Sequence, residues 1–362
     1  MHLLPDADSF KRLVDGSLRG PGPALARSVL AGLSLPYAAA VSARNAAFDR
    51  GLLPVSRAAV PVVSVGNLTL GGTGKTPLVA WVARSLAALG RRPAVVSRGY
   101  RAAPGAQSDE AAELAILLPA VPHVADRDRV AAAARAVALA ADVVVLDDGF
   151  QHRRLARDLD IVAVDATDPF GGDRLFPRGL LREPLAGVGR ADAIVLTRAT
   201  AVTADRRRQI RARLEEACGP RRPPAWIEAE HRPLRLRSAG GEIRPLEAVR
   251  SGRIVAFAGI GNPAAFRGTL AGLGADLAGF RGFADHHPYS ADDLHRLDGW
   301  ARELRADLVL TTLKDLVKAR VERIGGAPLL AVEIAMDVLA GSEALGRLLA
   351  RVAGTAAEGA AA

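Results

Sequence analysis

Lys75 and Thr76 end a glycine-rich turn that follows an apolar, β-branched run at residues 61–65. Backbone N–H groups of such a turn can crowd around phosphate oxygens, and the N-terminus of a following helix adds partial positive charge. A lysine here can reach the outer phosphates of a nucleotide, and a threonine hydroxyl can hold Mg²⁺. The segment therefore predicts a phosphate-binding loop followed by a helix at residues 78–89. Its expected contact residues are Gly71, Gly72, Thr73, Gly74, Lys75 and Thr76.

The match to the pattern G-x-x-x-x-G-K-[ST] has one departure, because Thr69 stands at the first glycine position. Composition nevertheless supports a specific use of Lys75. Of 48 basic residues only four are lysine, so arginine is the usual cation of this chain. A lysine kept in a glycine loop indicates a need for its compact ammonium. An ordinary strand–helix turn is the alternative, and we favour nucleotide binding.

Asp147 and Asp148 follow four aliphatic residues at 143–146. This run predicts a buried strand that ends in two carboxylates, the arrangement of a Walker-B motif. Mg²⁺ needs hard oxygen ligands and usually keeps several waters, so one or two carboxylates suffice. We therefore predict a magnesium site at Asp147 and Asp148 rather than an exposed acidic turn. Gln151 follows directly, and could face the same cleft or begin a solvated helix.

Two further groups could do acid–base chemistry. The first is the pair Asp109–Glu110, which is weak evidence alone because acidic pairs are common on loops. The second is Asp285-His286-His287, which could bind metal, cap a helix or place one imidazole beside a carboxylate. Adjacent histidines point to different sides in most backbones, so a two-histidine metal site is disfavoured. One imidazole tuning a carboxylate as a proton acceptor is the better chemical use.

Length and charge limit the classes of protein. The 362 residues are enough for two domains, and the net charge of +9 predicts attraction to phosphates or anionic lipid. No RNA- or DNA-binding module is recognisable, so no nucleic-acid partner is expected. The single cysteine, Cys218, excludes an internal disulfide and a cysteine-rich zinc site.

The N-terminal segment has an apolar stretch at residues 24–43 with basic residues on both sides. No signal peptide is apparent. Arg27 and Pro36 interrupt the stretch, which argues against a spanning helix. An apolar body with basic flanks is typical of a helix that lies on an anionic membrane. A helical arm packed on its own domain is the other interpretation, and the two are compatible.

Strands and helices alternate along the rest of the chain. Strands are expected at 92–97, 142–147, 160–165 and 191–197, which predicts a doubly wound parallel sheet with ligands at the strands' carboxyl ends. Residues 226–236 and 242–246 could form a two-stranded ribbon. A second α/β unit follows, with strands at 254–258, 307–311 and 329–334. Residues 259–264 resemble a dinucleotide fingerprint, but a tight turn with Pro263 in the first helical turn is favoured.

Six sequence blocks, in this order, resemble the tetraacyldisaccharide 4′-kinase family of the lipid A pathway in Gram-negative bacteria. The departure at Thr69 is also similar to this family. The blocks cover residues 64–77, 97–100, 147–153, 181–184, 257–263 and 285–289. The resemblance implies phosphoryl transfer from ATP, with Mg²⁺, to the 4′-hydroxyl of an acylated glucosamine disaccharide 1-phosphate. It places this reaction at the cytoplasmic face of the inner membrane.

The resemblance also implies an organisation. We expect a P-loop NTPase-like doubly wound sheet, and a smaller α/β domain joined to it by a two-stranded ribbon. The expected segments are a membrane-associating arm (1–50), a P-loop kinase domain (51–224), the ribbon (225–250), a C-terminal α/β domain (251–354) and a disordered tail (355–362). A monomer is expected.

Roles carry over by position. By resemblance, Lys75 and Thr76 serve the phosphates and Mg²⁺, Asp109 is the base, and His286 is the imidazole that supports it. The acidic cluster around the metal comprises Glu110, Asp147 and Asp148. Residues near the substrate are Arg98, Gln151 and Arg182.

Two positions depart from the family pattern. Ala111 replaces the usual proline after the acidic pair, which affects the alignment of Asp109. The usual Thr-Glu-Lys-Asp reads Thr-Leu-Lys-Asp at 312–315, which leaves the role of that loop open.

We expect the ribbon to act as a hinge whose closure brings His286 to Asp109. The competing functions are a P-loop ATPase switch controlling membrane or partner binding, a nucleic-acid-binding ATPase, and a kinase of another small acceptor. The switch would not need an Asp-His pair in a second domain.

Overall fold

The computed structural model describes residues 7–99 and 109–354, which form two compact units. The phosphate-loop unit comprises residues 8–99, 117–231 and 336–354, and the C-terminal unit comprises residues 109–116 and 232–335. The predicted tail at 355–362 lies outside the described residues. Our predicted domain boundaries remain a prediction. The observed division differs from them in joining residues 109–116 and 232–250 to the C-terminal unit, and residues 8–50, 225–231 and 336–354 to the phosphate-loop unit.

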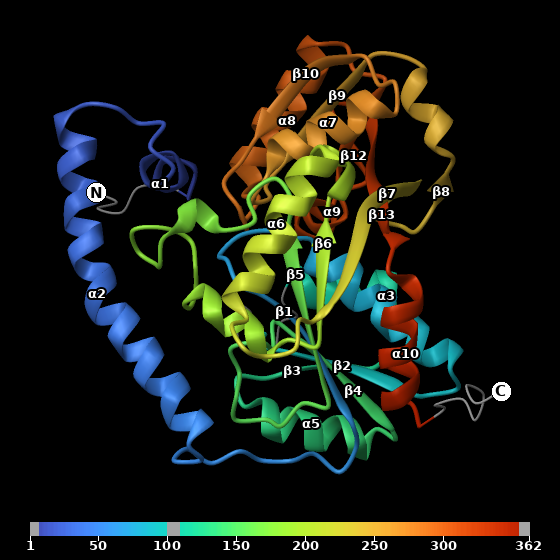
Figure 1. Cartoon of the computed structure of the whole chain (residues 1–362). Coiled ribbons are helices and arrows are strands. Elements are labelled where there is room, and N and C mark those ends of the chain that lie inside the picture. The colour runs from blue at the N-terminus through green and yellow to red at the C-terminus, as the bar shows by residue number, and fades with distance from the viewer. Residues whose placement is uncertain (1–6, 100–108, 355–362) are drawn as a thin grey trace. The chain divides into compact units, whose positions relative to one another are not determined.

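A parallel sheet forms the centre of the phosphate-loop unit (Figure 1). Its strand order is β7-β6-β5-β1-β4-β2-β3, and every neighbouring pair is parallel. The strands are β1 (Val62–Asn67), β2 (Pro93–Ser97), β3 (His123–Ala125), β4 (Val143–Asp147), β5 (Leu159–Asp165), β6 (Ala193–Thr197) and β7 (Ala225–Arg237). The chain order reverses around β1, which lies between β4 and β5. Ligands of doubly wound sheets bind at such a reversal, outside the strands' carboxyl ends.

Helices cover both faces of this sheet, which is why its central strands are apolar along their whole length. Every residue of β1, β2, β4, β5 and β6 is buried. The helices are α1 (Ala7–Val14), α2 (Pro21–Asp49), α3 (Lys75–Ala88), α5 (Arg129–Ala138), α6 (Ala204–Ala217) and α10 (Ser342–Val352). Short 3₁₀ turns are η1 (Gly171–Asp173), η2 (Leu185–Arg190) and η3 (Ala199–Ala201).

Helix α2 packs by one face only. Residues of that face recur at helical spacing and are half-buried or buried, namely 30, 34, 37, 41, 45 and 48. The Tyr37 hydroxyl donates to the Arg182 carbonyl at 2.8 Å, and the Asn45 amide donates to Glu183 at 2.9 Å. The expectation of an arm packed on its own domain is therefore confirmed.

The C-terminal unit has its own parallel sheet in the order β10-β9-β11-β13. Its strands are β8 (Ile243–Arg244), β9 (Ile254–Ala258), β10 (Leu277–Gly282), β11 (Leu308–Thr312), β12 (Arg323–Ile324) and β13 (Ala327–Ala340). Its helices are α4 (Asp109–Leu117), α7 (Pro263–Gly272), α8 (Ala291–Glu303), α9 (Leu313–Ala319) and the 3₁₀ turn η4 (Leu246–Arg250). Two α/β units with parallel sheets confirm the predicted fold class.

Local predictions in this unit have mixed outcomes. Pro263 begins α7 and the Asn262 side chain caps it, accepting from the Ala265 N–H at 3.0 Å, so the predicted strand–helix turn is confirmed. The ribbon is short, since β7 pairs with β8 only at residues 236–237. The sequence analysis missed β10, because this edge strand is mostly half-exposed and lacks the continuous apolar run of its neighbours.

Candidate functional site

The phosphate loop connects β1 to α3 and is held by hydrogen bonds from within its own unit. The Asn67 amide donates to the Thr69 carbonyl at 2.7 Å and to the Thr73 hydroxyl at 3.1 Å. The Thr197 hydroxyl, at the end of β6, donates to the Thr73 carbonyl at 2.9 Å. Gly71 has φ 113°, in the region that favours glycine. These bonds fix the course of the loop between β1 and α3.

The departure at Thr69 has a structural reason. Thr69 forms an antiparallel bridge with Leu181, flanked by hydrogen bonds from Leu70 N–H to Leu180 and from Arg182 N–H to Leu68. The backbone at Thr69 does not have the positive φ that would require glycine. The same bridge ties Arg182 to the loop.

Gly74 is required by both conformation and space. Its φ is 77°, and a Cβ on this residue would lie 2.2 Å from two ring atoms of His231. Burial, reinforced by the charge of Arg198, lowers the pKa of His231 to about 4, so this imidazole is neutral near pH 7. The sequence analysis missed His231, because a lone histidine in a strand gives no local signal.

Lys75, Asp148 and Arg182 form a charged cluster beside the loop. The Lys75 ammonium lies 3.6 Å from the Asp148 carboxylate, and Arg182 Nη1 donates to both Asp148 oxygens at 2.8 and 2.9 Å. Burial opposes the ionised form of Asp148, but Lys75 and Arg182 outweigh it and hold the pKa of Asp148 well below its usual range. Asp148 is therefore ionised near neutral pH, and its charge is balanced by Lys75 and Arg182.

The predicted magnesium ligands lie on separate elements. Thr76 lies in the first turn of α3, and Asp147 is the buried last residue of β4, paired in register with Val65 of β1. Glu110 belongs to the C-terminal unit. Within the described ranges no cluster of three or more His, Cys, Asp or Glu side chains is arranged to hold a metal. Carboxylate and hydroxyl oxygens beside a phosphate loop fit Mg²⁺, which binds to one or two carboxylates plus phosphates.

The predicted substrate residues differ in their surroundings. Arg98 follows β2 and is exposed. The Gln151 side-chain amide makes hydrogen bonds within the protein: it donates to the Asn67 carbonyl and to Glu183, both at 2.9 Å. Glu183 is 1% exposed and also accepts from Arg190 at 2.7 Å. The Glu183 carboxylate thus connects the loop after β4, through Gln151, to helix α2, through Asn45.

Arg129 is a second residue that the sequence analysis missed. It begins α5 and is only 7% exposed. Burial and the charge of Arg98 lower the pKa of Arg129, while Asp147 and Asp148 raise it. Because arginine is the usual cation of this chain, its type alone could not mark this position.

Asp109 and His286 lie together in the C-terminal unit. Asp109 begins α4, and its Oδ2 lies 3.8 Å from His286 Nδ1. His286 has φ 60°, an uncommon conformation for a residue with a side chain. On the other side of the ring, Lys314 Nζ is 3.2 Å from Nε2 and 3.1 Å from Asp285 Oδ1. Burial and Lys314 lower the pKa of His286, against the opposing carboxylates.

This placement corrects the expected hinge motion. We predicted that closure brings His286 to Asp109 from another domain, and that prediction is wrong because both residues belong to one unit. The N-terminal turn of α4 belongs with the sheet of residues 254–335 rather than with its sequence neighbours. The replacement of proline by Ala111 is compatible with this helix, in which Ala111 is buried.

The neighbouring histidine has a different environment. His287 Nε2 lies 3.1 Å from Asp293 Oδ2, and its ring contacts Phe283 and Tyr289 at centroid distances of 4.8 and 5.1 Å. The two adjacent histidines thus have separate partners, as expected. This geometry supports one imidazole beside a carboxylate rather than a two-histidine metal site.

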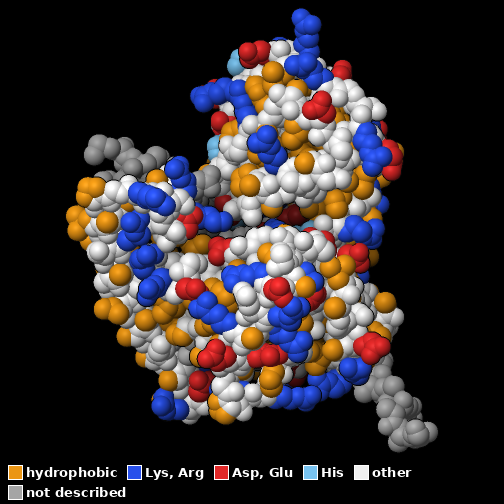
Figure 2. Space-filling view, turned by 45° about the horizontal axis from the view of Figure 1, so that its top comes forward, with side chains coloured by type: hydrophobic (Ala, Val, Ile, Leu, Met, Phe, Trp, Pro, Cys, Tyr) orange, Lys and Arg blue, Asp and Glu red, His pale blue; other side chains and the backbone are white. Residues whose placement is uncertain are grey.

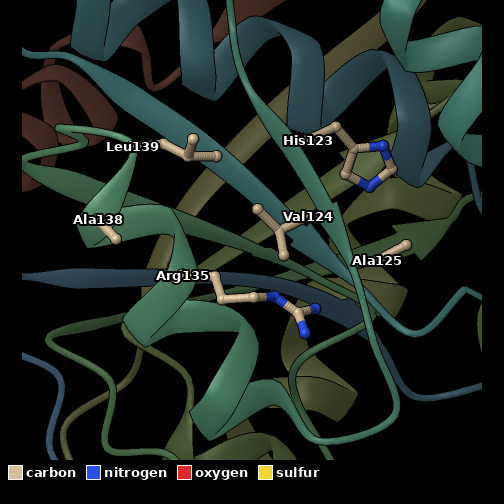
Figure 3. Close-up of a pocket in the computed structure, with 6 residues that line it drawn as sticks. All are labelled: His123, Val124, Ala125, Arg135, Ala138 and Leu139. Atoms are coloured by element: carbon tan, nitrogen blue, oxygen red, sulfur yellow. The ribbon is translucent and has the colours of Figure 1, made fainter.

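A separate hollow lies between β3 and the end of α5 (Figure 3). Its lining is mostly apolar, with a volume of about 450 Å³. None of the predicted site residues line it. Its lining residues are His123, Val124, Ala125, Arg135, Ala138 and Leu139.

Comparison with known proteins gives a consistent result. A family model described as tetraacyldisaccharide-1-P 4′-kinase (LpxK) matches residues 26–353. The chain is 42% identical to the tetraacyldisaccharide 4′-kinase of Anaeromyxobacter dehalogenans strain 2CP-C, over 91% of this chain and 92% of that protein. It is 41% identical to the tetraacyldisaccharide 4′-kinase of Geobacter metallireducens, over 81% and 89%.

The fold is similar to a solved member. The crystal structure of LpxK from Aquifex aeolicus in complex with ATP aligns with a TM-score of 0.70 and 31% identity, covering 90% of this chain and 99% of that one. The sequence relatives and the solved fold thus agree with the order of the motifs. The chain therefore belongs to the tetraacyldisaccharide-1-phosphate 4′-kinase family, as its sequence motifs predicted.

Proposed function

We propose that this protein transfers the γ-phosphoryl group of ATP to the 4′-hydroxyl of a lipid disaccharide 1-phosphate. In this proposal Lys75 binds the phosphates and Asp109 is the base. The observation that carries the proposal is that the chain contains both an ion cluster at the phosphate loop of one unit and an Asp–His pair in the other unit. A phosphate loop alone serves any nucleotide-binding protein. An added base beside a neutral imidazole is what an alcohol acceptor needs.

The phosphate-loop unit supplies positioning and charge. Phosphoryl transfer passes through a loose transition state, so charge neutralisation and alignment contribute most of the acceleration. Lys75 reaches the outer phosphates, and Asp148 with Arg182 fixes the direction of its ammonium. Thr76, Asp147 and Asp148 would hold Mg²⁺, which neutralises phosphate charge when bound.

The C-terminal unit supplies the base. Asp109 accepts the proton of the sugar hydroxyl as the new bond to phosphorus forms. His286 orients Asp109, and its neutral state near pH 7 agrees with its lowered pKa. The 3.8 Å separation of the pair exceeds a hydrogen bond, and such contacts commonly tighten when substrates bind.

Base and phosphate loop belong to different units, so the reaction requires both units to act on the same substrates. Domain closure therefore stays a prediction. Its expected role is now to bring Asp109 and His286 together toward the phosphate loop. Distances between spectroscopic labels on the two units should change when nucleotide binds. A constant distance in all nucleotide states would contradict closure.

A transfer assay tests the proposed reaction. We would incubate the full chain with γ-labelled ATP, Mg²⁺ and detergent-dispersed tetraacyldisaccharide 1-phosphate. Label should move to the lipid, and ATP consumption should depend on it. Hydrolysis of ATP at the same rate without lipid, and no label in the lipid, would instead favour the ATPase switch.

The exposed face of α2 supports a peripheral membrane location. By length and composition α2 could cross a bilayer, and no residue of its most apolar window is buried. Its opposite face, however, is bonded to the phosphate-loop unit through Tyr37 and Asn45, which suits a helix lying along the surface. Leu25, Val29 and Leu33 are 68%, 55% and 53% exposed. Figure 2 shows hydrophobic and basic side chains together over this helix, at the left margin.

Vesicle sedimentation tests this location. Changing Leu25, Val29 and Leu33 together to serine should reduce binding to anionic vesicles and leave ATP affinity unchanged. The matched control changes Val55, Leu139 and Leu339, which are comparably exposed elsewhere, and should bind as wild type does. Equal binding by all three proteins would contradict the assignment. The cytoplasmic face, the monomeric state and the absence of a nucleic-acid partner remain predictions.

A further inference from the structure

Lys314 lies in the first turn of α9 and contacts the side of His286 that faces away from Asp109. Its Nζ is 3.2 Å from His286 Nε2 and 3.1 Å from Asp285 Oδ1. The side chain is 17% exposed, so water competes little for the ammonium. An ammonium has three donors and no acceptor. His286 Nε2 must therefore accept this hydrogen bond.

This contact decides which nitrogen of the imidazole carries its proton. A neutral imidazole has one N–H and one lone pair, and the bond made by one nitrogen sets the state of the other. With Nε2 as acceptor, the proton of His286 resides on Nδ1. That nitrogen faces Asp109 Oδ2 at 3.8 Å. The lysine thus turns the ring into a hydrogen-bond donor toward the base.

The backbone holds Lys314 firmly in this place. The Thr312 side chain caps α9, accepting from the Asp315 N–H at 3.2 Å. Asp315 is fully buried and accepts from the Gly259 N–H at 2.9 Å and from the Thr312 hydroxyl at 2.6 Å. Lys318 pairs with Asp315 at 2.8 Å from the next turn. The first turn of α9 is therefore anchored to the end of β9, and Leu313, where the family has glutamate, is buried in the packing.

We propose that Lys314 is a positioning residue of the reaction, which fixes the Nδ1–H tautomer of His286 and so directs that N–H toward Asp109. The proposal rests on the role proposed above for Asp109. Lys314 acts through the imidazole, and Asp285 holds the ammonium beside the ring.

Nitrogen NMR tests the tautomer directly. Long-range ¹H–¹⁵N correlation spectra of the full chain, with ¹⁵N-labelled histidine and assignment by His286→Gln, should show His286 protonated at Nδ1 at pH 7.5. In Lys314→Met the tautomer should change toward Nε2–H. Lys314→Arg keeps a donor-only cation and should retain the Nδ1–H form. A wild-type spectrum with Nε2–H would overturn the proposal.

Kinetics supply a second readout. The charged groups facing His286 are Asp109 and Glu110 from α4, Asp285 from its own loop and Lys314 from α9. Lys314→Met removes the ammonium and should raise the pKa of His286. The acidic limb of the pH dependence of kcat should therefore move to higher pH in this variant. We expect kcat at pH 7.5 to fall by roughly 10- to 100-fold, with the KM for ATP little changed.

Arg320→Met, an exposed position at the C-cap of the same helix, is the matched control. It removes a positive charge outside the contacts that anchor Lys314, and should leave the tautomer and the pH profile unchanged. A Lys314→Met variant with the wild-type tautomer and pH profile would contradict the proposal. The NMR experiment needs neither ATP nor lipid. Failure of the transfer assay would therefore refute the proposed function without deciding the role of Lys314.

Discussion

The phosphate loop and the Asp109–His286 pair position their reactive groups by different means. In the phosphate loop, the reactive residues are consecutive in the sequence: Gly74, Lys75 and Thr76 begin one helix. Asn67 holds Thr73 from six residues away, and Thr197 adds a distant support. In the C-terminal unit, the base, the imidazole and the ammonium come from α4, a loop and α9. A phosphate needs many modest donors, which consecutive backbone N–H groups supply. A catalytic base such as Asp109 needs one partner side chain in a defined direction, and tertiary packing brings that partner, His286, to it.

The same comparison appears in the electrostatics. Around Asp148, positive charge from Lys75 and Arg182 holds the pKa of the carboxylate down although burial opposes it. Around His286, burial and the Lys314 ammonium lower the pKa of the imidazole. One region thus keeps a carboxylate ionised, and the other keeps a ring neutral. Variants that disrupt one region show whether the other continues to function.

The largest effect is expected from Asp109→Asn. The amide keeps the shape but cannot accept a proton, so kcat should fall by about 10² to 10⁴. ATP affinity, measured by calorimetry, should stay at the wild-type value, since Asp109 lies in the C-terminal unit. Asp276→Asn, an exposed position in the same unit, is the control. A variant that retained transfer would show that another group is the base.

Lys75→Met should disrupt the other region. Loss of the ammonium should reduce kcat by about 10² to 10³ and should also weaken ATP binding. Lys75→Arg keeps the charge but not its compact shape, and should restore binding more than rate. Equal recovery of both by arginine would mean that charge alone matters at this position. Titration calorimetry and the transfer assay provide the two readouts.

Gly74→Ala should destabilise the phosphate-loop unit by about 2–4 kcal/mol, because it combines a positive φ with a Cβ clash against His231. Gly72→Ala is the matched control, since its Cβ would meet nothing within 4 Å and its φ is not positive. That change should cost less than about 1 kcal/mol. The double variant Gly74→Ala/His231→Ala should recover the part due to the clash. Thermal unfolding would separate these outcomes, and equal midpoints for the two single variants would refute the steric account.

The smallest effect concerns pH and the pair Arg182–Asp148. The folded pKa of Asp148 lies below its ordinary value, so the pairing stabilises the fold above pH about 4 and is lost as the pH falls through the folded pKa. Arg182→Gln should therefore reduce the unfolding free energy by about 1 kcal/mol at pH 7 and by less at pH 3. Arg208→Gln removes an exposed pair and should change little at either pH. A constant difference between wild type and Arg182→Gln would contradict the linkage.

Lysine is rare in this chain, and two of its four lysines lie at the sites described above. The scarcity of lysine singled out Lys75, and the same reasoning applies to Lys314, which lies beside His286. Leu313, the departure from the family pattern, directly precedes Lys314. The side chain at that position packs inward, whereas Lys314 on the next position reaches the imidazole.

The sequence by itself determined the strands at residues 62–67, 143–147 and 254–258, the phosphate loop, the capped turn at Pro263 and the family. The strands, the loop and the capped turn depend on residues close together in the sequence, where periodicity and local hydrogen bonding decide the outcome. The family follows from six such local blocks in their order along the chain. Tertiary structure alone decided that α4 carries Asp109 into the C-terminal unit, that His231 faces Gly74, and that Lys314 meets His286. These contacts join residues distant in the chain. They follow from how helices and strands pack, which no local pattern of residue types encodes.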